Sequence, residues 1–297
     1  MKLSIKATSS GFRVLTEKNT TAMKTTQQIL AYLLIPFILG LFSCEEEMPD
    51  VSGRNYIYEL RSISEQGIDG HMKIRERNDG STQVELVLNG VDPDGTYPAY
   101  IHFNNALEGG GIAITLTPVD GHSSNSVTEI RTLDSGTSIT FEELREFDGH
   151  LNIQLGNDRG TIAAQADIGL NALTGRFQQF NLYEGDLEGV SGILTIEERE
   201  SEFSLITVQI EGSIPGKQHP VTLNFGSIQA KSGIAGTLNP VDGNTGIGKT
   251  HIEQLDGKLV APYRALVELQ GFIRIHMGTG VEMNTILAQG NIAFVEN

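Results

Sequence analysis

The stretch GIAITLTPVDG, residues 111–121, recurs almost unchanged as GIAGTLNPVDG, residues 233–243. The same offset of 122 positions aligns Gly70 with Gly192 and continues without a gap over residues 60–157. Self-similarity at a fixed offset is the sequence signature of a repeated structural unit. The chain is therefore an internal duplication, and we expect each copy to fold in the same way.

Within each copy the hydrophobic pattern is that of short strands. HMKIRERN (71–78) and STQVELVLNG (81–90) alternate apolar and polar residues, and ILTIEERE (193–200) and FSLITVQIEG (203–212) do the same in the second copy. This period of two is typical of strands with one buried face. Because turn residues follow each short run, we predict an all-β protein made of two tandem antiparallel Greek-key β-sandwiches.

One short helix is expected in each copy. Thr140 followed by Glu143 has the spacing of a capping box, in which each side chain binds the backbone of the other residue. The sequence LREF (144–147) follows at once, and PYRALVEL (262–269) is its counterpart in the second copy. The predicted organisation is a signal peptide over 1–43, a tether over 44–54, repeat 1 over 55–170, a linker over 171–177 and repeat 2 over 178–297.

The longest apolar run, ILAYLLIPFILGLF, covers residues 29–42. A transmembrane helix needs about 20 residues, whereas this length fits the core of a signal peptide. Lys24 supplies a short basic region if translation starts at Met23. A start at Met1, with a longer basic region, remains the alternative.

The run ends in LFSC, and Cys44 is the single cysteine of the chain. This ending resembles the bacterial lipoprotein signal, which implies cleavage before Cys44 and attachment of acyl chains; a secreted protein with an incidental cysteine is the alternative. Several acyl chains give stable membrane anchoring. The acidic run at 45–47 reads either as a solvated tether or as a signal resembling the surface-export signal of Bacteroidetes-type lipoproteins.

Charge and cysteine content exclude several classes of function. The net charge is −16, from 37 acidic and 21 basic residues, and an acidic surface repels nucleic acid. One cysteine excludes an internal disulfide framework and multi-cysteine metal sites. We therefore expect an exported outer-membrane protein that is attached to the membrane by its acyl chains rather than by its fold. Exposure on the cell surface and a periplasmic location both stay open.

Three segments of the first copy carry a family resemblance: YPAYIHFNNALEGGGIAITLTPVDG (97–121), FDGHLNIQL (147–155) and TIAAQADIG (161–169). Together they resemble the CHRD (chordin-type) domain, and the resemblance covers nearly the whole mature chain, twice. It implies a Greek-key sandwich without an agreed biochemical activity. The HPAHIH and VNVH elements of bacterial CHRD domains are also similar to the histidine-bearing strands of Cu/Zn superoxide dismutases.

That second likeness implies metal-ligand positions, which this chain fills incompletely. The first copy has Tyr100, His102 and Gln154 there, with Tyr97 at the leading position. The corresponding residues of the second copy are Thr222, Asn224 and His276, with His219 leading. His102, His219 and His276 are therefore weak metal candidates, His219 with His276 being the best remaining set, and no metal or other cofactor is expected. The remaining histidines are expected to face solvent, namely His71, His122, His150 and His251.

A P-loop-like stretch and a set of acidic loop residues also have ordinary structural explanations. GNTGIGKT (243–250) matches the P-loop formula, but Asp256-Gly257 interrupts the helix that a P-loop must open. We expect no nucleotide there. Acidic loop residues offer oxygen ligands for calcium, although aspartate in turns more often caps the backbone; they are Asp92, Asp94, Asp120 and Asp242.

No catalytic residues are detected, and the lack of a G-x-S-x-G motif disfavours a serine hydrolase. The sequence therefore favours a non-catalytic surface module that binds a protein or glycan partner. The alternative is a degenerate metal-binding or antioxidant domain similar to superoxide dismutase.

Overall fold

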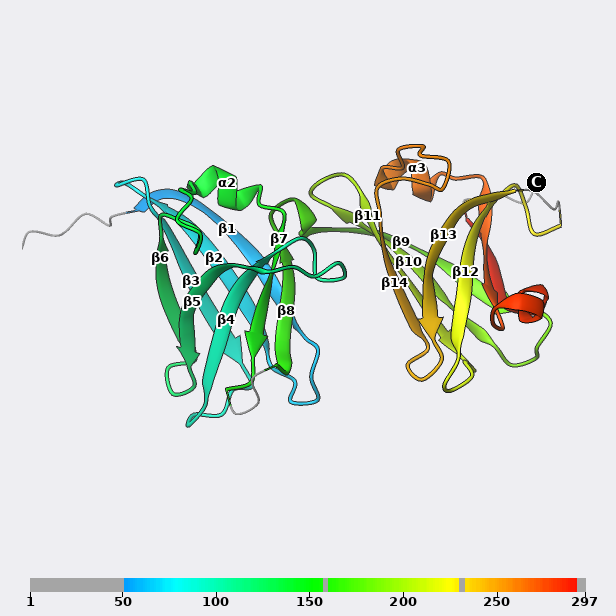
Figure 1. The fold of residues 1–297 in the computed structure, drawn as a ribbon, viewed down its shortest axis with the longest axis horizontal. Helices are drawn as coiled ribbons and strands as arrows, with labels where there is room; N and C mark the ends of the chain where they lie inside the picture. Colours follow the sequence, from blue (N-terminus) through cyan, green and yellow to red (C-terminus); the bar gives the residue numbers. More distant parts are fainter. Residues whose placement is uncertain (1–50, 157–159, 230–232, 293–297) are drawn as a thin grey trace, which may run out of the picture. The chain divides into compact units, whose positions relative to one another are not determined.

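The computed structural model describes residues 51–156, 160–229 and 233–292. It contains two eight-stranded antiparallel sheets, each closed into a barrel (Figure 1). The expected all-β tandem architecture is confirmed. In each unit the first and last strands pair with each other, so that the layers expected of a sandwich belong to one continuous sheet.

The first barrel has the strand order β1-β2-β3-β6-β5-β4-β7-β8, in which the steps β3-β6 and β4-β7 are the Greek-key connections. Its strands are β1 (Val51–Ser62), β2 (Asp69–Arg77), β3 (Thr82–Asn89), β4 (Thr96–Phe103), β5 (Ile112–Asp120), β6 (Asn125–Ile130), β7 (Gly149–Gln154) and β8 (Ile162–Ile168).

The second barrel repeats this order as β10-β11-β14-β13-β12-β15-β16-β9. Its strands are β9 (Leu173–Glu184), β10 (Ser191–Arg199), β11 (Ser204–Glu211), β12 (Gln218–Phe225), β13 (Ile234–Asp242), β14 (Ile247–Ile252), β15 (Gly271–His276) and β16 (Ile286–Ile292). The duplication seen in the sequence is thus a duplication of strand order.

Strand bounds differ from the expected domain bounds at two places. Residues 51–54 of the expected tether belong to β1, and residues 173–177 of the expected linker belong to β9. A 3₁₀ turn, η1 (Gly169–Asn171), connects β8 to β9. Because β9 begins within two residues of this turn, the connection between the barrels is hydrogen-bonded secondary structure.

The alternating pattern places one side of each strand in the core. Along β3 the even positions Val84, Leu86 and Leu88 are buried, while the residues between them are only partly covered. Met72 and Ile74 on β2 are fully buried beside them. Each barrel has its own cluster of buried aliphatic residues, which is what the repeated period of two predicts.

The expected helices are α2 (Phe141–Arg145) and α3 (Tyr263–Val267). The capping box is present: the Glu143 amide donates to Thr140 Oγ1 at 3.3 Å, and the Thr140 amide donates to Glu143 Oε2 at 2.8 Å. Phe141 and Leu144 of α2 are buried in the first core. Helix α3 has no side-chain cap, since Pro262 stands where α2 has Thr140.

Residues 1–50 lie outside the described part, and with them the predicted signal peptide, Cys44 and the acidic run 45–47. Among the described residues, no helix has the length and apolarity needed to span a membrane.

Gly70 and Gly192, which the repeat aligns, lie at equivalent places where two strands approach closely. A Cβ atom built on Gly70 would stand 2.0 Å from the backbone oxygen of Val87, and one on Gly192 would stand 2.1 Å from that of Gln209. We predict that Gly70→Ala lowers the free energy of unfolding by about 1–3 kcal/mol, since the clash is with backbone. Urea denaturation measures this loss.

Gly111→Ala is the matched control, because a Cβ atom there meets nothing within 4 Å. Its stability should change by less than about 0.5 kcal/mol. Equal losses in the two variants would contradict the close approach at Gly70.

Candidate functional site

His102 on β4 and His150 on β7 are directly opposite each other across the two strands. Their ring centroids lie 5.0 Å apart and the ring planes are within 13° of parallel. The expectation that His150 faces solvent is wrong, because its side chain is only 3 % exposed. It projects from the outer face of the barrel, where the segment that follows β4, residues 104–111, covers it.

This covering segment is held by both imidazoles. His150 Nδ1 lies 2.8 Å from the Asn104 carbonyl oxygen, and His102 Nδ1 lies 3.0 Å from that of Gly110. A carbonyl oxygen only accepts, so both Nδ1 atoms carry the proton, and the Nε2 atom of His150 then accepts from the Asn152 side-chain amide at 3.4 Å. Burial lowers the pKa of His150, with the backbone hydrogen bond acting in the opposite direction. The His102 Nε2 atom is buried without a hydrogen-bond partner.

The other expected metal positions do not converge on one ion. His219 is fully buried; its Nε2 accepts the Ile214 amide at 3.1 Å and its Nδ1 donates to Met277 O at 2.9 Å. His276 is likewise engaged, through Thr222 Oγ1 at 3.1 Å and Met283 O at 2.7 Å.

Strand alternation separates these two histidines. His219 shares the inward face of β12 with the core residue Val221, whereas His276 contacts Thr222 on the outward face. The best remaining pair from the sequence is therefore on opposite sides of one sheet. Among the described residues, no group of three or more His, Cys, Asp or Glu side chains has the geometry to hold a metal ion.

The remaining predicted positions have structural environments. Asp120 Oδ1 accepts the Ser123 amide and Asp242 Oδ1 accepts the Asn244 amide, and these backbone hydrogen bonds lower the pKa of both carboxyls. The Asp92 carboxylate accepts the Asp94 amide in the same way. The carboxylates of Asp92, Asp120 and Asp242 thus cap turns. His122 is exposed as expected and His71 is half-buried, whereas the His251 side chain is only 9 % exposed, which corrects its expected solvent-facing position.

The P-loop-like stretch has no helix. Residues 243–246 form a turn, and Lys249 and Thr250 lie in strand β14. Thr250 Oγ1 accepts the Asn239 amide at 2.9 Å, so the hydroxyl that a P-loop would offer to Mg²⁺ secures the neighbouring strand instead.

One carboxylate that sequence reasoning missed links this face to the second barrel. Asp167 Oδ1 accepts the Ala106 amide at 2.7 Å, which holds the covering segment, and Asp167 Oδ2 accepts a 2.7 Å hydrogen bond from Arg199 Nη1. Arg199, at the end of β10, is fully buried and also donates to the Asn171 carbonyl. The repeat gave a partial signal, because Arg77 occupies the position aligned with Arg199. It gave no signal for the partner, which comes from the other copy.

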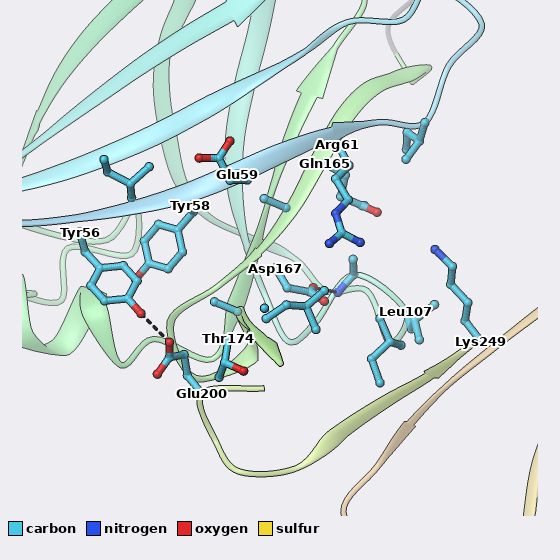
Figure 2. Close-up of a pocket in the computed structure, with 18 of the residues that line it drawn as sticks. Tyr56, Tyr58, Glu59, Arg61, Leu107, Gln165, Asp167, Thr174, Glu200 and Lys249 are labelled. Carbon is cyan, nitrogen blue, oxygen red and sulfur yellow. Dashed lines mark hydrogen bonds between the residues drawn. The ribbon is translucent and has the colours of Figure 1, made fainter. Parts of the chain in front are cut away.

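Beside Asp167 lies a cavity of about 670 Å³ (Figure 2). Its walls come from β1, from the end of β8, from the covering segment and from the second barrel, which contributes the start of β9 and three further residues. The lining includes Tyr56, Tyr58, Glu59, Arg61, Leu107, Gln165, Asp167, Thr174, Glu200 and Lys249.

The two ends of the cavity differ in chemistry. At one end Tyr56 donates a 2.5 Å hydrogen bond to Glu200 Oε1, and burial together with this carboxylate raises the pKa of Tyr56 to about 12. At the other end Figure 2 places Arg61, Leu107 and Lys249. Arg61 is 68 % exposed and has only a 3.6 Å contact with Glu197, and Lys249 has no ion-pair partner among the described residues. This end therefore offers two cations to a ligand.

Breaking the Asp167–Arg199 pair should cost far more than breaking a surface pair. Asp167→Asn leaves a fully buried guanidinium without a counter-charge, so we predict a loss of about 3–5 kcal/mol in the free energy of unfolding, measured in urea. Arg176→Met is the control, because it removes an arginine from an exposed pair with Glu198. That variant should retain nearly all of the stability. A loss in Asp167→Asn no larger than in the control would refute the buried pair.

The lowered pKa of His150 gives a pH dependence of known sign. The unfolded chain, with an ordinary pKa of about 6.5, takes up the proton more readily than the folded protein, so stability is lost as the pH falls below about 6.5. We predict that the loss between pH 7.5 and 5.5 is smaller in His150→Asn than in the parent protein. Denaturation midpoints at the two pH values provide the comparison, and identical pH dependences would contradict the assignment.

The molecule thus has a mixed apolar and charged cavity, and its buried imidazoles are held by hydrogen bonds to the backbone. The residues that line the cavity include tyrosines, carboxylates, an arginine and a lysine, but no histidine, cysteine or serine. Comparison with protein-family models, with curated proteins and with solved structures finds no match to this chain.

Proposed function

We propose that this protein is a lipid-anchored component of the outer membrane whose two CHRD-like domains act as a non-catalytic binding module. The observation that carries the proposal is the 670 Å³ cavity. Its size is within the range of ligand pockets, and it combines tyrosine rings, aliphatic side chains and a few convergent charges, as such pockets do.

Two features support binding rather than chemistry at this place. The cavity contains carboxylates, two cations and two tyrosines but no histidine, cysteine or serine. The Tyr56 hydroxyl already donates a hydrogen bond to Glu200, and its raised pKa keeps it protonated. A neutral phenol and charged side chains bind a protein or glycan partner through hydrogen bonds and ion pairs and leave its covalent bonds unchanged.

The anchor is proposed from the sequence ending LFSC at Cys44 and the acidic run after it. Removal of residues 1–43 leaves 16 basic and 36 acidic residues, so the mature protein is strongly acidic. Acidic surfaces are repelled by anionic headgroups, which leaves the acyl chains to hold the protein at the membrane. Its partners would then be molecules of the cell envelope, with neither nucleotide nor nucleic acid among them.

A degenerate metal-binding function is the second candidate. The buried, unpartnered Nε2 atom of His102 beside His150 favours it, because ligating histidines commonly donate their other nitrogen to a carbonyl, as both do here. Nearly parallel rings, however, point their lone pairs alongside each other rather than at one ion. Copper or zinc bound there would be held weakly.

The proposal is tested by placing a photocrosslinking amino acid at Leu107, in the cavity wall, in cells that make the full-length protein. We expect a discrete adduct from position 107 and none from Val281, an 85 % exposed residue that does not line the cavity. Combining the label with Cys44→Ala should release the protein from membranes and remove the adduct. Membrane retention of Cys44→Ala would overturn the anchor, and equal labelling from both positions would overturn the binding site.

A further inference from the structure

The first barrel is closed over only part of its height. Strand β1 pairs with β8 through two residue pairs, Arg61 with Gln165 and Ser62 with Ala164. On its other edge β1 pairs with β2 from Asn55 to Leu60 without interruption. Strand β8 continues to Ile168 and pairs there with β7 alone. The two strands therefore separate, and within the described part of the chain each leaves one edge without a neighbouring strand.

The direction of the free backbone groups follows from one hydrogen bond. The Ile63 amide donates to the Ala163 carbonyl at 3.1 Å, so residue 63 directs its backbone toward β8. Backbone groups alternate sides along a strand, and the β1–β2 register is regular between Asn55 and Leu60. The N–H and C=O groups of Asn55, Ile57 and Glu59 therefore point toward the β8 side, where no strand receives them.

These open edges line the cavity described above. Residues 55–59 of β1 and residues 165–167 of β8 both contribute to its wall. A residue in a sheet occupies about 160 Å³, from a rise of about 3.3 Å, a strand spacing of about 4.8 Å and a sheet thickness of about 10 Å. A volume of 670 Å³ thus accommodates about four residues of an additional strand.

We propose that the cavity binds an extended peptide segment of a partner protein, which adds a strand along the free edge of β1. This inference rests on the proposed binding function and specifies its ligand class. Main-chain hydrogen bonds to Asn55, Ile57 and Glu59 supply affinity, as in other cases of strand addition. A glycan has no regularly spaced amide groups and leaves these edges unsatisfied.

The cavity also selects side chains of the peptide. Arg61 and Lys249 at one end, the latter without an ion-pair partner in the described part of the chain, favour an acidic residue. The exposed side chains of Ile57, Ile63 and Leu107 favour an aliphatic or aromatic residue next to it. The carboxylates of Glu59, Asp167 and Glu200 also line the cavity, so the attraction for an acidic residue is confined to the end that Arg61 and Lys249 form.

The second barrel supplies an internal control. Its strands β9 and β16 also close through two residue pairs, Tyr183 with Gln289 and Glu184 with Ala288. There, however, Gly290 approaches β9 so closely that a Cβ atom would stand 2.3 Å from the Asn181 backbone oxygen. The gap between β9 and β16 is therefore narrower than the gap between β1 and β8. The position that the repeat aligns with Ile57 is Gln179.

The test begins with a displayed library of random decapeptides, selected on the full-length protein in detergent. Ile57→Pro removes an amide that faces the cavity and leaves the ladder to β2 intact, whereas Gln179→Pro makes the same change in the second barrel. Selected peptides should be acidic and should bind Ile57→Pro about five- to tenfold more weakly, the loss expected for one backbone hydrogen bond. Binding to Gln179→Pro should be unchanged.

A measurement on the unaltered protein guards against misfolding of the proline variant. The selected peptide should slow hydrogen exchange of the amides of residues 55, 57 and 59, and the same peptide with alternate backbone amides N-methylated should not. Peptides that bind both proline variants equally, that protect β9 instead, or that are no better than their methylated forms overturn the proposal. A glycan adduct at position 107 would overturn it while leaving the binding function in place, and the absence of any adduct would overturn both.

Discussion

Closure of each barrel rests on two residue pairs between its first and last strands. In a closed barrel every strand has a neighbour on both edges, and closure removes the exposed edges that would otherwise attract other chains. The first strand is 12 residues long in each barrel and the last strand only seven. Two paired residues are enough to complete the ring, but the excess length of β1 then runs past its partner. The free strand edges follow from this difference in length, and in the first barrel they line the cavity, whose wall is completed by the covering segment and by residues of the second barrel.

Much of the fold could be predicted from the sequence, because its signals are local. Alternation of apolar residues along 81–90 predicts β3, and the Thr140–Glu143 spacing predicts the start of α2, since each pattern depends on neighbours a few residues away. The repeated glycines are likewise explained, because Gly70 and Gly192 lie where backbones approach too closely for a side chain. Because the sequence is duplicated, each local prediction also applies to the equivalent segment of the other barrel.

The site could be predicted only in part, because its contacts join distant residues. His150 is buried by a segment that precedes it by some 40 positions, and no local pattern reports how that segment folds over β7. Asp167 and Arg199 lie 32 positions apart in different copies, so the repeat, which compares equivalent positions, gives no sign of their pairing. The P-loop-like stretch shows the converse: its local pattern is complete, and the strand pairing of β14 with β11 determines its conformation.

The pair of Asp167 and Arg199 also bears on how the chain could have evolved and how it can be cut. Duplication of a gene segment makes two equal copies, and each copy must at first have folded without the other. The first barrel carries Asp167, whose counter-charge, Arg199, belongs to the second barrel. A fragment that contains the second barrel alone would leave this buried guanidinium without a counter-charge. The repeated sequence unit and the cooperative folding unit are therefore no longer the same stretch of chain. A fragment designed from the repeat alone would separate Asp167 from Arg199 and leave the guanidinium buried without its counter-charge.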